Sequence, residues 1–301
     1  MIKHLLTAAL MLVFTTIHAQ KIEQLHIPCF EGGADLSPLS QCNSTDFQAA
    51  LEQTISRNPK WKRLLDDKKL AIGLVDLRDT NNVRFAQLNG NEMMYAASLP
   101  KIAILLSAMD AFEKKEMAET REIKKDLKLM INRSDNKAST RMIDRLGYKK
   151  IEAVLTDPRY KFYDKTTGGG LWVGKRYASG GARNPDPLKG LSHAATATQI
   201  CRFYYMMMQG KLVSTKRSQE MLKYMADSHI HHKFVNSLNI VAPSARVFRK
   251  SGSWQSFHSD SALVWGPKRK YILTALVDHP DGEKIMRALI YEVEKLINKA
   301  T

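Results

Sequence analysis

Long hydrophobic runs are scarce in this sequence of 301 residues, and the one that is present lies near its start. Leu5–Ile17 is nearly all apolar, follows the basic pair Lys3 and His4, and precedes the small residue Ala19. The run is too short for a membrane span, and a basic start, an apolar core and a small residue are typical of a cleaved secretory signal. We therefore expect residues 1–19 to be a signal peptide and the mature protein to be secreted, in a bacterial periplasm. An uncleaved membrane anchor is the alternative.

Cysteine is scarce as well, with three residues in the whole chain. Cys29 and Cys42 lie in residues 20–43, a segment without periodicity that we expect to be an N-terminal extension. In an oxidising compartment these two cysteines are candidates for a disulfide. Cys201 lies within an apolar helical pattern, which is typical of a buried thiol and not of a catalytic one.

Acidic residues are outnumbered by basic ones, 30 against 46, which gives a formal net charge of +16. Such a charge suggests binding to nucleic acid. The basic residues, however, are spread over the expected helix faces, and a secreted protein is separated from cellular nucleic acid. We therefore expect no nucleic-acid binding. The charge suits anionic envelope surfaces or anionic substrates.

Metal ligands at a recognisable spacing are also missing. His229, His231 and His232 have no cysteines or carboxylates beside them at a metal-binding spacing, so we expect a surface loop there and no metal. The sequence leaves the oligomeric state open.

Apolar periodicity and turn residues predict a helix, two strands, a helical block, three strands and a final helix, in that order. No repeat and no linker divides this pattern, so we expect one domain over residues 44–301. One expected helix begins at or just before Ser98, and the charged stretch 113–128 is also expected to be helical. The expected strands are residues 70–77, 83–88, 247–254, 261–265 and 271–277.

The tetrapeptide Ser98-Leu99-Pro100-Lys101 precedes a run of apolar residues at helical spacing. Pro100 fits the first turn of a helix, where its missing N–H has no intrahelical partner. Residues three apart on a helix share a face, so a hydroxyl nucleophile and an amine that can act as a base would lie together. A capping serine followed by a solvated lysine is the alternative, and Ser134–Lys137 shows the same S-x-x-K spacing.

Two further motifs follow in order, Ser134-Asp135-Asn136 and Lys250-Ser251-Gly252. Together with the Ser98 tetrapeptide they form the signature of serine β-lactamases and penicillin-binding proteins. From about residue 47 to residue 299 the chain resembles the class A β-lactamase-like family of secreted serine hydrolases.

The resemblance implies an α+β fold with a five-stranded antiparallel sheet, flanked by the terminal helices, and an all-helical lobe. The α/β part would comprise about residues 44–97 and 245–301, and the lobe about residues 98–244, with the active site between them. No cofactor is implied. The expected partner is a small molecule, a β-lactam or a substrate resembling a peptidoglycan peptide.

Catalytic roles follow from the resemblance motif by motif. Ser98 would be the nucleophile that forms an acyl-enzyme, and Lys101 would remove its proton, which requires a neutral amine and a lowered pKa. Ser134 would relay a proton to the leaving nitrogen. Lys250 would lie near Ser134 and the substrate carboxylate.

Substrate-binding roles follow in the same way. Asn136 would hold the amide side chain of the substrate, and Ser251 and Gly252 would line the substrate on the third motif. The backbone N–H groups of Ser98 and Ser253 would form the oxyanion hole. Asp135 is expected to brace its loop through backbone hydrogen bonds.

The chain departs from the family in the loop and on the strand after the third motif. Between residues 157 and 190 it has no glutamate to activate a deacylating water, only Asp157, Asp164 and Asp186. The place of a carboxylate-binding arginine holds Ser259, with His258 beside it as a candidate substrate contact.

Three functions follow from these departures. The first is a hydrolase acting on β-lactams or related amides. The second is a D-Ala-D-Ala peptidase-like, penicillin-binding enzyme that deacylates poorly. The third is a catalytically silent binding protein on the same scaffold.

Overall fold

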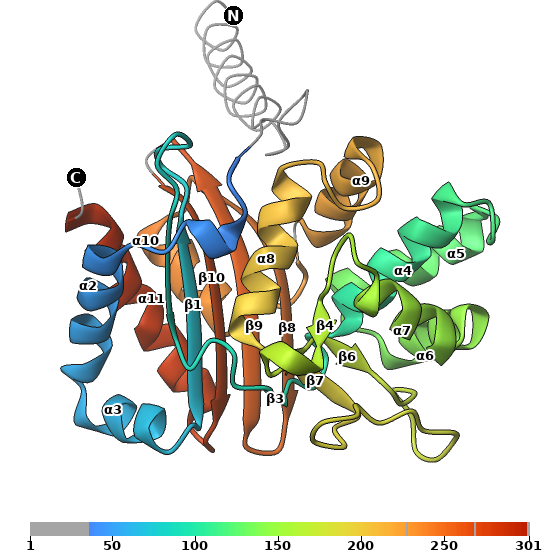
Figure 1. The fold of residues 1–301 in the computed structure, drawn as a ribbon, viewed down its shortest axis with the longest axis horizontal. Coiled ribbons are helices and arrows are strands. Elements are labelled where there is room, and N and C mark those ends of the chain that lie inside the picture. Colours follow the sequence, from blue (N-terminus) through green and yellow to red (C-terminus); the bar gives the residue numbers. More distant parts are fainter. Residues whose placement is uncertain (1–35, 227, 268, 300–301) are drawn as a thin grey trace, which may run out of the picture.

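A five-stranded antiparallel sheet forms the centre of the protein in a computed structural model that describes residues 36–226, 228–267 and 269–299 (Figure 1). The strand order is β2-β1-β10-β9-β8, and every neighbouring pair is antiparallel. This confirms the predicted sheet. The strands are β1 (Leu70–Asp76), β2 (Arg84–Leu88), β8 (Arg246–Trp254), β9 (Phe257–Gly266) and β10 (Arg269–Asp278).

One face of the sheet is covered by helices from both ends of the domain, as Figure 1 shows on its left side. Ser44 caps the first of these helices by accepting a hydrogen bond from the N–H of Phe47. Phe47 and Leu289 belong to one apolar core with the residues on this face of the sheet. The helices are α2 (Thr45–Ser56), α3 (Pro59–Asp66), α10 (Phe234–Val241) and α11 (Gly282–Lys299).

The opposite face packs against α8 and joins the helical lobe through a second, larger apolar core. Buried residues of α4, among them Ile102 and Leu105, belong to this core together with Phe248 of β8. The start of α4, which follows Ser98, therefore lies between the sheet and the lobe. The helices are α4 (Lys101–Glu113), α5 (Arg121–Asn132), α6 (Asn136–Leu146), α7 (Tyr148–Thr156), α8 (Ala197–Met208) and α9 (Thr215–Met225).

The helix expected from Ser98 begins three residues later, at Lys101. Ala97 has a positive φ of 49°, and the N–H of Lys101 donates to the carbonyl of Ser98, so Ser98 lies on a tight turn that leads into the helix. The continuous helix expected over residues 113–128 is interrupted at 114–120, where Lys115 also has a positive φ, of 58°.

The long loop of residues 157–190 is ordered by short strand pairings. Its strands are β4 (Tyr163–Asp164), β5 (Gly169–Gly170) and β6 (Trp172–Val173), with a short 3-10 helix at Lys165–Thr167; another 3-10 helix, Leu39–Gln41, lies before α2. The pairing of β6 with β7 (His193–Ala195), and of β7 with β3 (Met94–Tyr95), ties the segment to the chain just before Ser98.

The predicted signal peptide and Cys29 lie outside the described residues, so the Cys29–Cys42 disulfide stays a prediction. Cys201 is fully buried, and burial raises the pKa of its thiol to about 12, as expected for an inert thiol. Among the helices that the structure describes, none is long and apolar enough to cross a membrane.

Candidate active site

The side chain of Lys101 is fully buried at the start of α4. Its ammonium donates to the carbonyl of Ser134 at 2.6 Å, to the hydroxyl of Ser134 at 3.3 Å and to Oδ1 of Asn136 at 2.8 Å. These three acceptors match the three N–H groups of an ammonium. The first two motifs of the sequence therefore meet at one amine.

The third motif reaches the same point from the edge strand β8. Lys250 is buried, and its ammonium donates to the hydroxyl of Ser134 at 2.9 Å and to the carbonyl of Ser251 at 2.8 Å. The hydroxyl of Ser134 thus accepts from two lysines, which leaves its own proton free to be donated elsewhere. Ser134 also has a positive φ of 54°, the kind of local strain that accumulates at functional sites.

Ser98 lies against the backbone of the third motif. A Cβ on Gly252 would lie 2.5 Å from the backbone nitrogen of Ser98 and 2.8 Å from that of Leu99, so only glycine permits this approach. Ser98 is half-buried, and its hydroxyl makes no hydrogen bond to any residue that the structure describes. The hydroxyl of Ser98 is therefore accessible and unpaired in the described structure, and the hydrogen bonds of the Lys101 and Lys250 ammonium groups go to other acceptors.

Burial lowers the pKa of Lys101 to about 7, so near neutral pH about half of its amine lacks the extra proton. Burial also holds the pKa of Lys250 well below its usual value, and the positive charge of Lys101 lowers it further. The charge of Lys101 thus disfavours the charged form of Lys250. The site can hold the neutral amine that a general base requires.

The remaining residues of the motifs are Asp135 at the start of α6 and the residues of β8 that flank Gly252. Asp135 caps α6 by accepting from the N–H of Ala138 at 2.6 Å, the bracing role expected for it. Ser253 is exposed at the end of β8 beyond Gly252. Side chains alternate along a strand, so Ser251 lies on the face that carries Arg249, opposite to the face of Lys250.

His258 is not placed to bind substrate, contrary to the prediction. It pairs with Ser253 across the β8–β9 ladder, but its ring packs against Gly282 of α11, on the sheet face away from Ser98. Its neighbour Ser259 points toward Ser98, since its hydroxyl donates to the carbonyl of Ala96 at 2.8 Å. Strand alternation turns the two side chains to opposite faces.

Tyr177, in the long loop, was not singled out from the sequence, although it covers the amine of Lys101. The Nζ of Lys101 lies 4.4 Å from the ring centroid of Tyr177, and the Tyr177 hydroxyl donates to the carbonyl of Ala97 at 3.2 Å. The ring also lies 4.2 Å from that of His193, whose pKa burial lowers to about 4, so this histidine is neutral. An aromatic residue within an irregular loop carries no pattern that would have indicated this contact.

The three loop aspartates are bound elsewhere. Asp157 pairs with Arg159, Asp164 accepts from Thr166, and the buried Asp186 accepts from Tyr163 and from backbone N–H groups of its own loop. Within the described residues, none of these carboxylates hydrogen-bonds to Ser98, Lys101 or Ser134. The loop therefore presents an aromatic ring, and not a carboxylate, to the base.

A cleft of about 750 Å³ runs along the site between this loop and the end of β8. Asn136 and Tyr177 lie at the catalytic side of the cleft, and Trp254, with 59% of its surface exposed, forms part of the rim. Lys175 and Arg176 are the charged residues of its lining, and none of the lining residues is acidic. In the described part of the chain no cluster of three His, Cys, Asp or Glu residues could hold a metal.

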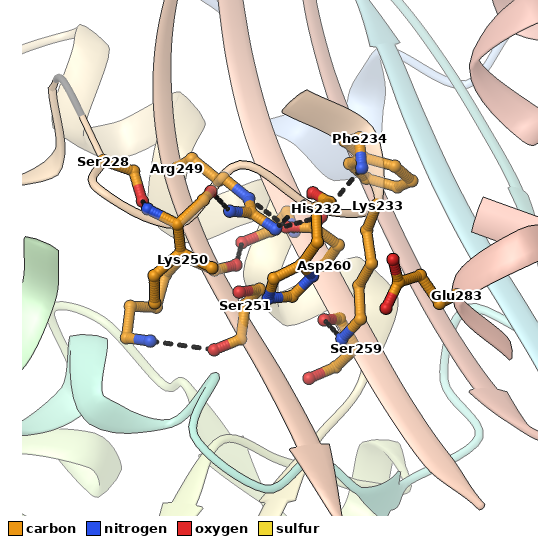
Figure 2. Close-up of polar contacts among 12 residues, drawn as sticks. Ser228, His232, Lys233, Phe234, Arg249, Lys250, Ser251, Ser259, Asp260 and Glu283 are labelled. Carbon is orange, nitrogen blue, oxygen red and sulfur yellow. Dashed lines mark hydrogen bonds and ion pairs between the residues drawn. The ribbon is translucent and has the colours of Figure 1, made fainter. Parts of the chain in front are cut away.

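A third buried lysine, Lys233, lies behind the third motif and was also missed from the sequence. Lys233 donates to the carbonyls of Gly252 and Ser259, and burial lowers its pKa to about 8 (Figure 2). Next to it, Arg249 and Asp260 form a fully buried ion pair with two hydrogen bonds of 2.8 Å. Lys233 follows His229, His231 and His232, and no periodic pattern in this segment indicates a buried lysine.

Comparison with known proteins places the chain in a family. The β-lactamase enzyme family matches residues 122–301, more than half of the chain, which include Ser134 and Lys250. No curated protein matches the sequence.

Solved structures share the fold at low sequence identity. A β-lactamase from Sphaerobacter thermophilus is 13% identical with a TM-score of 0.64, and the alignment covers 84% of this chain and 96% of that one. A mutant of PBP-A, solved as an acyl-enzyme complex with penicillin G, is 20% identical with a TM-score of 0.62, covering 85% and 98%. A β-lactamase from Chitinophaga pinensis is 13% identical with a TM-score of 0.62, covering 84% and 100%.

These likenesses agree with the five-stranded sheet and the helical lobe described above. Because the family match extends over more than half of the sequence, the chain belongs to the β-lactamase enzyme family.

Proposed function

We propose that this protein is a secreted serine hydrolase that is acylated at Ser98 by β-lactams or related amides and then hydrolyses the acyl-enzyme. The observation that carries the proposal is the buried Lys101 amine, which binds Ser134 and Asn136 one turn from an unpaired Ser98 hydroxyl. A solvated lysine, the alternative for an isolated S-x-x-K, would be exposed and would keep its ordinary pKa.

Acylation begins with the neutral form of Lys101. This amine accepts the proton of the Ser98 hydroxyl while the oxygen attacks the amide carbonyl, so a C–O bond forms and the carbonyl becomes an oxyanion. The N–H groups of Ser98 and Ser253 are the proposed donors to that oxyanion. Both belong to segments that meet at Gly252.

Collapse of the tetrahedral intermediate breaks the C–N bond. The hydroxyl of Ser134, held by Lys101 and Lys250, donates its proton to the leaving nitrogen and regains one from the protonated Lys101. Lys250 offers a positive charge for a substrate carboxylate. Asn136, which lines the cleft, is the proposed partner of the substrate's amide side chain.

A second candidate function is favoured by the loop. Tyr177 lies over Lys101, and the three loop aspartates of the described structure are bound to other partners, away from the position where a deacylating water would be activated. This arrangement supports a D-Ala-D-Ala peptidase-like, penicillin-binding enzyme, in which β-lactams acylate Ser98 and the acyl-enzyme persists.

Incubation with a chromogenic cephalosporin, followed by intact-mass analysis, tests both candidates. Sustained turnover with a transient adduct supports the hydrolase, whereas a stoichiometric burst with a lasting adduct supports the second candidate. Ser98→Ala is the matched control and should show neither. Absence of turnover and of adduct in the wild-type protein, with peptide amides also tested, would leave only a binding protein.

A further inference from the structure

Lys233 is a fully buried cation that the acylation mechanism does not use. It has a positive φ of 54° at the residue before α10, a conformation that costs free energy for a residue with a Cβ. Its ammonium donates to the carbonyl of Gly252 and, at 3.1 Å, to that of Ser259 (Figure 2). The described structure thus holds a strained, desolvated charge against the backbone of the third motif.

The carbonyl of Gly252 and the N–H of Ser253 belong to the same peptide group. In a trans peptide the two point in opposite directions, and electron density drawn to the carbonyl oxygen makes the N–H a stronger donor. β8 is the edge strand of the sheet, and Gly252 contacts the backbone of Ser98. One end of this peptide therefore meets Lys233 while its other end belongs to the oxyanion hole proposed above.

We propose that Lys233 is a positioning residue that polarises the Gly252–Ser253 peptide and so strengthens the oxyanion hole. The kinetic part of this proposal rests on the proposed acylation at Ser98. The polarisation itself is a property of the resting protein and does not depend on any substrate.

The charges around Lys233 support an action on the peptide and not on a paired carboxylate. Asp260 is bound by both the guanidinium of Arg249 and the N–H of Phe234, and Glu283 of α11 binds Arg287. Both carboxylates act on Lys233 from a distance, without a hydrogen bond to it. The hydrogen bonds of Lys233 in the described structure go to backbone carbonyls, and Ser259 adds a weaker donor to Gly252 at 3.4 Å.

The sequence permits a selective test, because Gly252-Ser253 is the only Gly-Ser pair in the chain. Labelling glycine with carbonyl ¹³C and serine with ¹⁵N gives a single cross-peak in a carbonyl–amide correlation spectrum, and it reports on this peptide alone. Lys233→Met should shift the Gly252 carbonyl carbon and the Ser253 amide proton upfield. Lys233→Arg, which keeps the charge, should retain most of the wild-type shift.

Ser237→Ala is the matched control. Ser237 is buried in α10 and donates to the carbonyl of Arg287, so its loss perturbs the same helix without touching Gly252. The cross-peak should stay in place in this variant. If Lys233→Met does not fold, Lys233→Gln replaces it, because glutamine supplies a neutral donor. A cross-peak that stays at its wild-type position in the Lys233→Met or Lys233→Gln variant would overturn the proposal.

The acylation rate constant gives the second readout. Removing a whole oxyanion donor costs about 10²–10³-fold in rate, so weakening one by Lys233→Met should cost about tenfold, with partial rescue by Lys233→Arg. If the wild-type protein forms no adduct, the proposal of acylation at Ser98 is wrong. The cross-peak then still shows whether Lys233 polarises the Gly252–Ser253 peptide. If the wild-type protein is acylated and Lys233→Met changes neither rate nor cross-peak, Lys233 has no such role.

Discussion

Lys101 is a fully buried lysine whose ammonium makes three hydrogen bonds, all to neutral acceptors. Desolvation disfavours the charged form, the three acceptors carry no negative charge, and the nearby charge of Asp135 offsets only part of the desolvation. The pKa therefore falls to about 7, into the range where a base works best at neutral pH. At this scale, burial of one amine is what converts a common tetrapeptide into a candidate catalytic pair.

The pH dependence of acylation tests this property. Because the neutral amine is the active form, the acylation rate should fall about tenfold per pH unit below pH 7 and level off above it. Stopped-flow measurement of the acylation rate constant across pH 5–9 checks the profile. A profile that is flat over this range would exclude Lys101 as the base.

Replacing the amine by a permanent cation gives a second test. Lys101→Arg keeps a positive charge but cannot lose its proton, so acylation should drop on the order of 10²–10⁴-fold. Lys137→Arg is the control, since Lys137 is exposed and belongs to the second S-x-x-K match. Equal rates in the Lys101 variant and the wild-type protein would contradict the assignment.

At the scale of elements, the long loop and the β8–β9 pair hold the site from two sides. The β3-β7-β6 sheet holds the loop against the chain before Ser98, which allows Tyr177 to reach both Lys101 and Ala97. On the other side, the buried Arg249–Asp260 pair joins β8 to β9 and anchors the segment before α10. The loop positions Tyr177, and the β8–β9 pair binds Lys233; neither residue belongs to the three motifs.

Tyr177 should control access of water to the acyl-enzyme. Tyr177→Ala opens the space over Lys101, so the deacylation rate should rise severalfold, because the amine can then bind water. Tyr177→Phe keeps the ring and loses only the hydrogen bond to Ala97, so its deacylation should stay near that of the wild-type protein. Decay of the adduct, followed by intact mass after excess β-lactam is removed, measures both; equal rates in all three proteins would contradict this role.

The Arg249–Asp260 pair should contribute strongly to folding. Asp260→Asn leaves a buried guanidinium without its counter-charge and should lower the free energy of unfolding by about 3–5 kcal/mol. Asp66→Asn breaks the exposed pair with Lys62 and should cost less than about 1 kcal/mol. Urea unfolding followed by circular dichroism compares the two variants, and losses of similar size would refute the expected difference.

At the scale of the whole molecule, positive charge is both general and concentrated at the site. The formal net charge is +16, and the charged residues that line the cleft, Lys175 and Arg176, are both basic. Charge of one sign in a cleft raises the local concentration of oppositely charged ligands, and added salt screens this effect. An anionic substrate is therefore favoured before it contacts any residue.

Salt should slow acylation by an anionic β-lactam. Raising the ionic strength from about 0.01 M to 1 M shortens the Debye length from about 30 Å to about 3 Å, so the second-order acylation constant should fall severalfold. A β-lactam ester without the carboxylate is the control and should change little. Equal salt dependence of the two compounds would show that the charge of the protein does not guide binding.

Much of the scaffold follows from local sequence. The strands of the central sheet, the apolar stripe of α11, the Ser44 cap of α2 and the Asp135 cap of α6 each depend on residues near one another in the chain. The three motifs likewise predicted which hydroxyls and amines would lie together, because each motif is recognised from a few consecutive residues. Periodicity and capping act over a few residues, so they can be recognised without knowing the fold.

Tertiary packing decided the rest. The sequence cannot tell that His258 turns toward α11 while Ser259 turns toward Ser98, because either face of β9 can be the inner one until the helices pack. Tyr177 and Lys233 lie in irregular segments, and their partners are separated from them by many residues, so no local pattern indicates either contact. A lysine is ordinarily solvated; whether it becomes a base or a buried positioning charge depends on which segments remove its water, and that is a property of the assembled fold alone.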